Sequence, residues 1–138
     1  MKTSKDNFEI VKSDQEWQEI LRPEQFDVLR KHGTEIAGTS PFNKQYRTGT
    51  YVCGGCGYPL FTSDIKYNSG TGWPSFYDSI KGAIATSVDQ SLFMTRKEVH
   101  CSRCGGHLGH VFSDGPAPTG LRYCINGVSL KFFPKEDI

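Results

Sequence analysis

Hydrophobic and polar residues follow one pattern in residues 13–33 and a different one in residues 34–138. In the first segment, apolar positions recur at helical spacing. Ser13 and Glu16 are spaced as a capping box, so a helix is predicted over residues 14–21. We expect its inner side to bury three residues, Trp17, Ile20 and Leu21.

A second helix is predicted over residues 23–32, because Pro23 suits the first position of a helix. Phe26 and Leu29 would face the interior of the protein. Gly33 would end the helix, since glycine readily adopts the left-handed conformation found there.

From Thr34 onward, aromatic and β-branched residues alternate with polar ones, and glycine-rich turn signals recur. This pattern is typical of short antiparallel strands. We expect strands near residues 49–53, 83–88, 98–101 and 110–114, and in two arms around Asn126-Gly127. A long structured loop over residues 61–80 would be a place for binding residues.

The segment GLRYCINGVSLKF, residues 120–132, contains the strongest turn signal of the chain. Asn126-Gly127 between two alternating runs predicts a two-residue hairpin turn. Its apolar face would pair Ile125 with Val128, Tyr123 with Leu130 and Leu121 with Phe132. Its polar face would carry Arg122, Cys124, Ser129 and Lys131. A thiol usually behaves as a small buried hydrophobe, so Cys124 is either a reactive group or a strand-end residue that happens to face water.

Length and charge narrow the class of protein. The 138 residues suffice for one domain with its own core. A formal net charge of +1 gives no reason to expect nucleic acid or a membrane surface as partner. No signal peptide is recognisable, and no apolar run approaches the ~18 residues of a membrane span. We expect a cytoplasmic, single-domain protein with a flexible tail (1–12), a helical lead-in (13–33) and a β body (34–138).

Four of the five cysteines fall in two Cys-x-x-Cys pairs, CGGCG with Cys53 and Cys56 and CSRCGG with Cys101 and Cys104. Four thiolates at about 2.3 Å suit a structural zinc ion with no open position for water. Because the pairs are far apart in the sequence, the metal would join two distant parts of the β body. A redox-active dithiol is the alternative. His100 is expected to be a loop residue rather than a further ligand.

Cys124 is the cysteine left outside these pairs. A reactive thiol needs its thiolate form, and nearby cations lower the pKa of the thiol. Arg122 lies two residues away on the same strand face, and Lys131 would lie diagonally across the hairpin. Asn126 at the turn could donate a hydrogen bond to a substrate at the sulfur.

A nucleophilic cysteine also needs a group that transfers protons, and HLGHVF offers His107 and His110. Residues three apart on a regular strand face opposite sides, so both can reach one site only if the chain bends near Gly109. The alternative places one or both in the core or on the surface. His32 closes a helix and is expected to be structural. In SGTGWPSF, the flanking glycines and proline favour Trp73 as a pocket wall over a core position.

The ordered motifs CxxCG, SGTGWPSF, CxxCG, HLGH and RYCIN resemble the B-type methionine-R-sulfoxide reductases over about residues 21–132. The resemblance implies a mainly β fold with two antiparallel sheets, preceded by short N-terminal helices. It implies one structural zinc ion per chain on Cys53, Cys56, Cys101 and Cys104. It also implies that Cys124 attacks the sulfoxide sulfur of methionine-R-sulfoxide, one of the two epimers that separate enzymes reduce.

The chemistry of the residues agrees with that mechanism. A sulfoxide oxygen leaves readily only when it is protonated, and an imidazolium can supply the proton near neutral pH. We expect His110 to be the acid and His107 to support it. Arg122 and Asn126 would fix the thiolate and the sulfoxide. Trp73 and Phe112 would bind the substrate. The products would be methionine and a sulfenic acid on Cys124.

Thr71 departs from the family pattern, because many relatives carry a resolving cysteine at this position. No cysteine precedes Cys53, so an internal disulfide would have to use a zinc ligand. We therefore expect an external thiol, such as thioredoxin, a glutaredoxin or a small thiol, to regenerate the enzyme. The expected substrate is methionine-R-sulfoxide in oxidised proteins, and the expected state is a monomer.

Two other functions would use the same residues. A Cys-His hydrolase or acyl transferase would pair Cys124 with His110 as a base, but it needs an oxyanion hole that the sequence does not reveal. A non-catalytic zinc-binding module would dock proteins or RNA. The near-neutral charge argues against the RNA partner.

Overall fold

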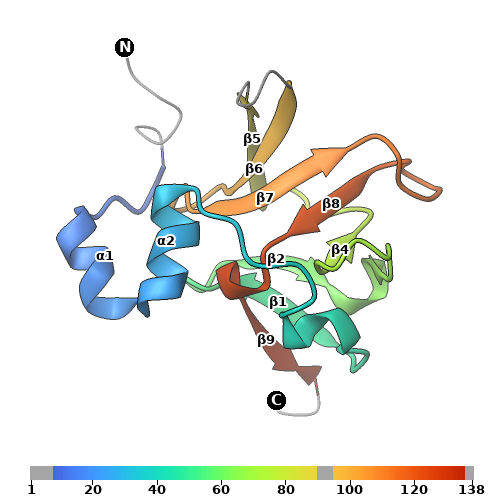
Figure 1. Ribbon diagram of the computed structural model, residues 1–138, viewed down its shortest axis with the longest axis horizontal. Coiled ribbons are helices and arrows are strands. Elements are labelled where there is room, and N and C mark those ends of the chain that lie inside the picture. The colour runs from blue at the N-terminus through green and yellow to red at the C-terminus, as the bar shows by residue number, and fades with distance from the viewer. Residues whose placement is uncertain (1–7, 90–94, 136–138) are drawn as a thin grey trace.

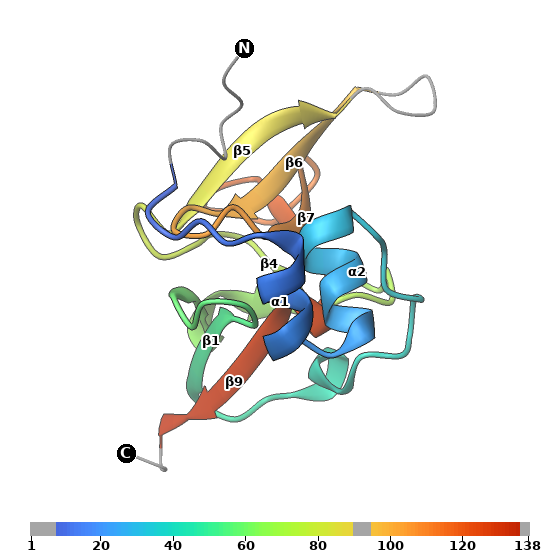
Figure 2. The same cartoon turned by 90° about the vertical axis from the view of Figure 1, so that its left-hand side faces the viewer.

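A computed structural model describes residues 8–89 and 95–135 of the chain. Two helices precede two antiparallel sheets, so the predicted fold class is confirmed (Figure 1). Seen from the side, the helices lie across the region where the sheets meet, with β5 and β6 above them and β1 and β9 below (Figure 2).

Helix α1, Asp14–Ile20, begins at the predicted capping box. The Ser13 hydroxyl accepts from the Glu16 N–H at 3.2 Å, and the Glu16 carboxylate accepts from the Ser13 N–H at 2.8 Å. Trp17 and Leu21 are buried as expected, but the prediction for Ile20 is wrong, since it is 59% exposed. Helix α1 packs against α2, and Trp17 is the residue within its bounds that is buried.

Helix α2, Pro23–Lys31, buries Phe26 and Leu29 as predicted. The prediction that Gly33 adopts the left-handed end conformation is wrong. His32 takes it instead, with φ at 60°, and Gly33 donates its N–H to the Asp27 carbonyl at 2.9 Å. The His32 side chain explains this choice, because its Nδ1 lies 2.5 Å from the Glu98 carboxylate.

The larger sheet has the strand order β3-β4-β8-β7-β6-β5, and the smaller one has the order β2-β1-β9. The strands of the larger sheet are β3 (Lys66–Tyr67), β4 (Ser75–Phe76), β5 (Ile84–Asp89), β6 (Arg96–Cys101), β7 (His107–Phe112) and β8 (Arg122–Ile125). Those of the smaller sheet are β1 (Gly49–Cys53), β2 (Pro59–Thr62) and β9 (Leu130–Pro134). Short 3-10 turns, at Pro41–Lys44 (η2), Ser63–Ile65 (η3) and Gly127–Ser129 (η5), join some of them.

The hydrophobic core contains a group of packed aromatic rings from both sheets. Tyr51 of β1, Phe61 of β2 and Phe76 of β4 are completely buried. Phe61 and Phe76 stack with their ring centroids 4.2 Å apart, and Tyr51 meets Phe76 edge-on at 5.2 Å. Offset and edge-to-face contacts of this kind add to the free energy gained by burying the rings.

The predicted hairpin at Asn126-Gly127 is wrong, because its two arms belong to different sheets: β8 pairs with β4 and β7, and β9 pairs with β1. The two favoured two-residue hairpin turns both need positive φ at the first position, whereas Asn126 has φ of −74°. The Asn126 amide instead accepts from the Glu35 N–H at 2.9 Å and donates to the Leu108 carbonyl at 3.0 Å. The Gly127 and Val128 N–H groups donate to the Glu35 carboxylate at 2.9 and 3.1 Å.

Of the predicted flexible tail, residues 1–7 lie outside the described residues, and the part that follows is attached to the body. The Ile10 N–H donates to the Arg103 carbonyl at 2.9 Å, and Glu9 pairs with the Arg103 side chain at 3.4 Å. These contacts lie on the second cysteine turn. Within the described ranges, 8–89 and 95–135, no helix is long and apolar enough to cross a membrane.

Candidate active site and metal centre

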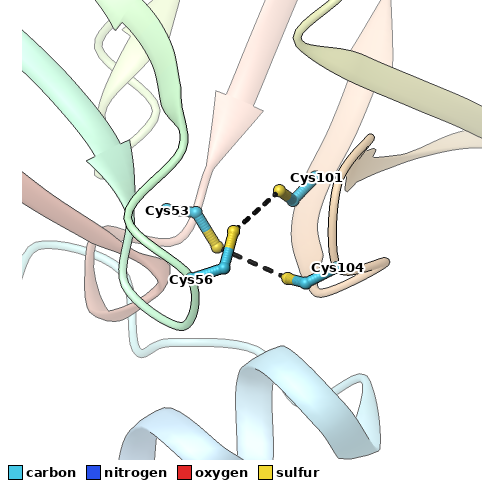
Figure 3. Close-up of side chains that lie close together, drawn as sticks. All are labelled: Cys53, Cys56, Cys101 and Cys104. Atoms are coloured by element: carbon cyan, nitrogen blue, oxygen red, sulfur yellow. Dashed lines mark hydrogen bonds between the residues drawn. The ribbon is translucent and has the colours of Figure 1, made fainter. Parts of the chain in front are cut away.

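The two Cys-x-x-Cys turns meet, and their four side chains point toward one centre (Figure 3). The Sγ atoms of Cys53 and Cys104 lie 3.7 Å apart, and those of Cys56 and Cys101 lie 3.5 Å apart. Four sulfurs at 2.3 Å from a tetrahedral zinc ion would be about 3.8 Å from one another. The cluster can therefore hold a metal ion, and its donors and spacing fit zinc.

The backbone of each turn supports the sulfurs. The Gly55 N–H donates to Cys53 Sγ at 3.3 Å, and the Gly106 N–H donates to Cys104 Sγ at 3.4 Å. Gly57 and Gly105 have φ of 82° and 76°, a conformation that L side chains rarely adopt. One turn follows β1 of the smaller sheet and the other follows β6 of the larger sheet, so a metal here joins the two sheets.

A cavity of about 330 Å³ lies against the strands β7 and β8. Its walls contain six of the seven predicted catalytic and substrate-binding residues, and His107 is the one that does not line it: Trp73, His110, Phe112, Arg122, Cys124 and Asn126. The other lining residues are Thr34, Thr71, Arg96 and Gly109. The structure thus brings together residues that the sequence distributes over more than 90 positions.

Cys124 and His110 are cross-strand partners, because β8 places Cys124 directly opposite His110 of β7. Side chains at such positions share one face of the sheet with Cβ atoms about 5 Å apart. Their position on neighbouring strands therefore holds the thiol and the imidazole close together without any loop.

The predicted bend between His107 and His110 is present as a β-bulge. Opposite β6, Val99 pairs with Gly109 and His100 pairs with His107, which leaves Leu108 as the extra residue. The bulge turns both imidazoles to one face, with ring centroids 5.6 Å apart. Gly109 is required for a different reason, since a Cβ there would lie 2.0 Å from the Cys124 carbonyl oxygen.

Each of the two histidines is held by a carboxylate. His107 is buried, with its Nδ1 2.6 Å from the Glu98 carboxylate. His110 Nε2 lies 2.9 Å from the Asp89 carboxylate. Burial lowers the pKa of His110, and the Asp89 hydrogen bond opposes that effect.

The expectation that cations lower the pKa of Cys124 needs correction. Burial raises the pKa of this thiol above its ordinary value, and the Thr71 hydroxyl and the Arg122 charge only partly oppose it. Arg122 is also engaged by Asp114, with hydrogen bonds of 2.9 and 3.1 Å. Lys131 plays no part, because it pairs with Val52 in the smaller sheet.

The aromatic and amide groups of the cavity are fixed by contacts behind them. Trp73 donates its indole N–H to the Glu35 carbonyl at 2.8 Å, so the indole stands as a wall. The Arg122 guanidinium lies over the Phe112 ring at 4.4 Å from its centroid. The Asn126 amide is already bonded to backbone groups, which fixes its place in the cavity wall.

Sequence reasoning missed the carboxylates Asp89, Glu98 and Asp114, and it took His100 for a loop residue. His100 is a buried residue of β6, and its Nε2 lies 2.9 Å from the Ser87 hydroxyl. A signal for Glu98 was present, because residues two apart on a strand share a face and Glu98 precedes His100 by two. Nothing in the sequence alone marked Asp89 as the partner of His110.

A thiol opposite an imidazole, in a cavity walled by two aromatic rings, is an arrangement suited to chemistry at a cysteine. The family model described as SelR domain matches residues 21–134, and the chain belongs to this family. The resemblance read from the motifs is thereby confirmed.

Curated relatives cover most of the chain. A protein of Leptospira interrogans named peptide methionine sulfoxide reductase MsrB is 58% identical over 127 residues, 91% of this chain and 97% of the relative. A protein of the same name from Methanosarcina barkeri is 56% identical over 131 residues, 93% of this chain and 91% of the relative. The chloroplastic peptide methionine sulfoxide reductase B3 of Oryza sativa is 48% identical over 130 residues, 93% of this chain and 56% of the relative.

Proposed function

We propose that this protein reduces methionine-R-sulfoxide in oxidised proteins to methionine, with Cys124 as the nucleophile. The observation that carries the proposal is the register of β7 and β8, which sets Cys124 opposite His110 inside the cavity. Membership of the SelR family, whose relatives above are named peptide methionine sulfoxide reductases, supports the same reaction.

The aromatic walls would select the epimer. Trp73 offers a flat apolar surface to the S-methyl group of the substrate, and Phe112 bounds the cavity beside Arg122. With the methyl group on Trp73 and the sulfur at Cys124, only one configuration at sulfur directs the oxygen toward His110. That epimer is the R form in this proposal.

The chemical step transfers an oxygen atom and two electrons. The Cys124 thiol gives its proton to His110, and the thiolate attacks the sulfoxide sulfur. His110 then protonates the sulfoxide oxygen, which moves as a hydroxyl group to the Cys124 sulfur while the bond between the two sulfurs breaks. The thiol and the sulfoxide are converted into a sulfenic acid and methionine, so no other proton or electron is consumed.

External thiols would complete the cycle. Two thiol groups convert the sulfenic acid back to the thiol, with release of water and formation of one disulfide. Thr71 stands where many relatives have a resolving cysteine, so we assign the step to thioredoxin, a glutaredoxin or a small thiol. We also assign the enzyme to the cytoplasm, since free thiols suit a reducing compartment. We assign it as a monomer.

The four-cysteine cluster would hold one zinc ion per chain in a structural role. Cys53, Cys56, Cys101 and Cys104 would supply all four ligands, which leaves no position for water or substrate. Its contribution would be to fix the turns after β1 and β6. The family membership favours neither a Cys-His hydrolase nor a non-catalytic zinc module.

The test is a single turnover without reductant, with R- and S-configured N-acetyl-methionine sulfoxide in separate reactions. We expect one methionine per chain from the R epimer only, and one added oxygen on Cys124 by mass spectrometry. Cys124→Ser is the matched control and should form no product. Absence of product from both epimers, with zinc bound and Cys124 still reduced, would reject the proposal in favour of the hydrolase or the module.

A further inference from the structure

Behind the cavity, three histidines surround one carboxylate. Glu98 Oε2 lies 2.5 Å from His32 Nδ1, 2.6 Å from His107 Nδ1 and 3.6 Å from His100 Nε2. Glu98 and His100 belong to β6 and His107 to β7, while His32 ends α2. The cluster is therefore built by three elements, and none of its members takes part in the chemical step proposed above.

We propose that His32, Glu98 and His107 form a second metal site, which binds a divalent transition-metal ion such as Zn²⁺. Their ligand atoms, two imidazole nitrogens and a carboxylate oxygen, all lie within 4.8 Å of one another. Two imidazoles and one carboxylate are a common ligand set for zinc and for other divalent first-row metals. The site is separate from the four-cysteine cluster, which offers only sulfur.

The exposure of the three side chains suits capture of an ion from solution. The side chains of Glu98 and His107 are only 11% and 3% exposed, so the sheet holds two ligands in place. The His32 side chain is 59% exposed, at the end of a helix, and can move outward. Ligand atoms around a tetrahedral zinc ion are about 3.3 Å apart, so His32 and His107 need to separate from Glu98 by less than about 1 Å.

The backbone of His32 gives an independent reason to assign this residue a binding role. Among the residues that the structure describes, it is the one non-glycine residue with positive φ. Gly33 follows directly and could adopt that conformation without a Cβ penalty. The left-handed conformation of His32 instead accompanies an imidazole placed on Glu98, and unfavourable backbone conformations of this kind cluster at functional sites.

The remaining coordination positions also have candidates. His100 Nε2 lies close to the same carboxylate oxygen, and solvent reaches the site from the side of His32. On binding, the ion would replace the protons that now join each Nδ1 to Glu98, since a metal-bound imidazole nitrogen carries no hydrogen.

The experiment counts zinc without measuring activity, so its outcome does not depend on the proposed reaction. Protein that holds one zinc per chain on the four cysteines is dialysed against micromolar free Zn²⁺ and analysed for metal and protein. We expect two zinc ions per wild-type chain. His32→Gln should weaken binding of the second ion by at least about tenfold and return the count to one. Asp27→Asn, an exposed change on the same helix, is the matched control and should retain two.

Three further measurements keep the test decisive. Glu98→Gln should also abolish the second equivalent, and circular dichroism of each variant shows whether the fold is intact. Co²⁺ added to the zinc-loaded protein should give the weak visible bands of nitrogen and oxygen ligands without sulfur charge-transfer bands. A wild-type count that stays at one, or a second ion that His32→Gln does not affect, would overturn the proposal.

Discussion

Thr71 Oγ1 lies 3.9 Å from Cys124 Sγ. The loop that carries Thr71 is held by a chain of hydroxyl groups, with Ser69 Oγ 2.8 Å from Thr71 Oγ1 and 2.7 Å from Ser75 Oγ. Position 71 is therefore held beside Cys124, the proposed nucleophile. A sulfur atom at this position would be within reach of a sulfenic acid on Cys124.

We predict that Thr71→Cys converts the catalytic cycle to one with an internal disulfide. A disulfide bond is about 2.05 Å long, so the two side chains need to approach by about 2 Å, which rotation about their χ1 bonds can provide. After one turnover, peptide mapping without reductant should find a disulfide between positions 71 and 124. The wild type and Thr71→Ser should carry a sulfenic acid instead, and a Cys124-containing internal disulfide in either of them would refute the assignment.

Arg122 should influence the reactivity of Cys124, whereas Lys131 should not. Arg122 lowers the pKa of the thiol against the effect of burial, and Lys131 is exposed on β9 of the other sheet. Arg122→Gln should slow alkylation of Cys124 by iodoacetamide about three- to tenfold at mildly alkaline pH. Lys131→Gln removes the same charge and should leave the rate unchanged. Equal effects of both variants would mean that only net charge matters.

The pKa directions predict an unusual pH profile. The pKa of His110 is lowered from 6.5 and that of Cys124 is raised from 9.0, so the resting pair is a neutral imidazole and a thiol. The reactive pair, an imidazolium and a thiolate, is a minor form of the protein. As the pH increases, the fraction of this form rises until the pH reaches the His110 pKa. It then stays constant, and it falls once the pH exceeds the Cys124 pKa. Single-turnover rates at low substrate should therefore show a plateau from below pH 6.5 to above pH 9.0. An acid limb above pH 6.5 would contradict this assignment.

Asp89→Asn tests the assignment of His110 in this pH profile. The Asp89 carboxylate opposes the effect of burial on His110, so its loss should lower the His110 pKa further. The reactive fraction on the plateau should then fall about three- to tenfold. The alkaline limb, which reports Cys124, should remain where it is.

The two helices and most strands could be predicted from the sequence, because a capping box and the alternation of apolar and polar residues each involve only a few neighbouring residues. The prediction of a hairpin at Asn126-Gly127 was wrong because of an interaction between residues far apart in the sequence. Asn126 and Gly127 form the most favourable local turn of the chain, but Glu35, 91 residues away, bonds the Asn126 side chain and the two N–H groups that follow it. Three hydrogen bonds, two of them buried and one partly buried, outweigh a local turn preference of about 1 kcal/mol.

The site shows the same division between local and non-local information. Cys124, His110 and the four paired cysteines could be chosen from the sequence because their residue types and spacing are rare. The pKa of Cys124 could not be predicted, since it depends on burial that only the packed sheet defines. Asp89 lies 21 residues from His110 and meets it only because β5, β6 and β7 are neighbours.

Glu35→Gln should lower the free energy of unfolding. Each oxygen of the buried Glu35 carboxylate accepts one backbone N–H, from Gly127 and from Val128. Glutamine has one oxygen and one NH₂ group, so one N–H donor would lose its acceptor at a cost of about 1–3 kcal/mol. Urea unfolding should show a lower midpoint with an unchanged slope. Glu24→Gln, on the exposed face of α2, is the control and should change the midpoint little.

Loss of the zinc ion proposed for the four-cysteine cluster should destabilise the whole domain rather than one turn. The cluster connects β1 of the smaller sheet to β6 of the larger sheet, and Cys53, Cys101 and Cys104 are buried. Without the ion, the two turns would be joined only by weak contacts between thiol groups. Cys53→Ser should release the metal and lower the thermal midpoint by about 10 °C or more, since a structural zinc site contributes several kcal/mol to folding. Calorimetry with metal analysis checks this, and a metal-free variant that melts at the wild-type temperature would show that the cluster has no structural role.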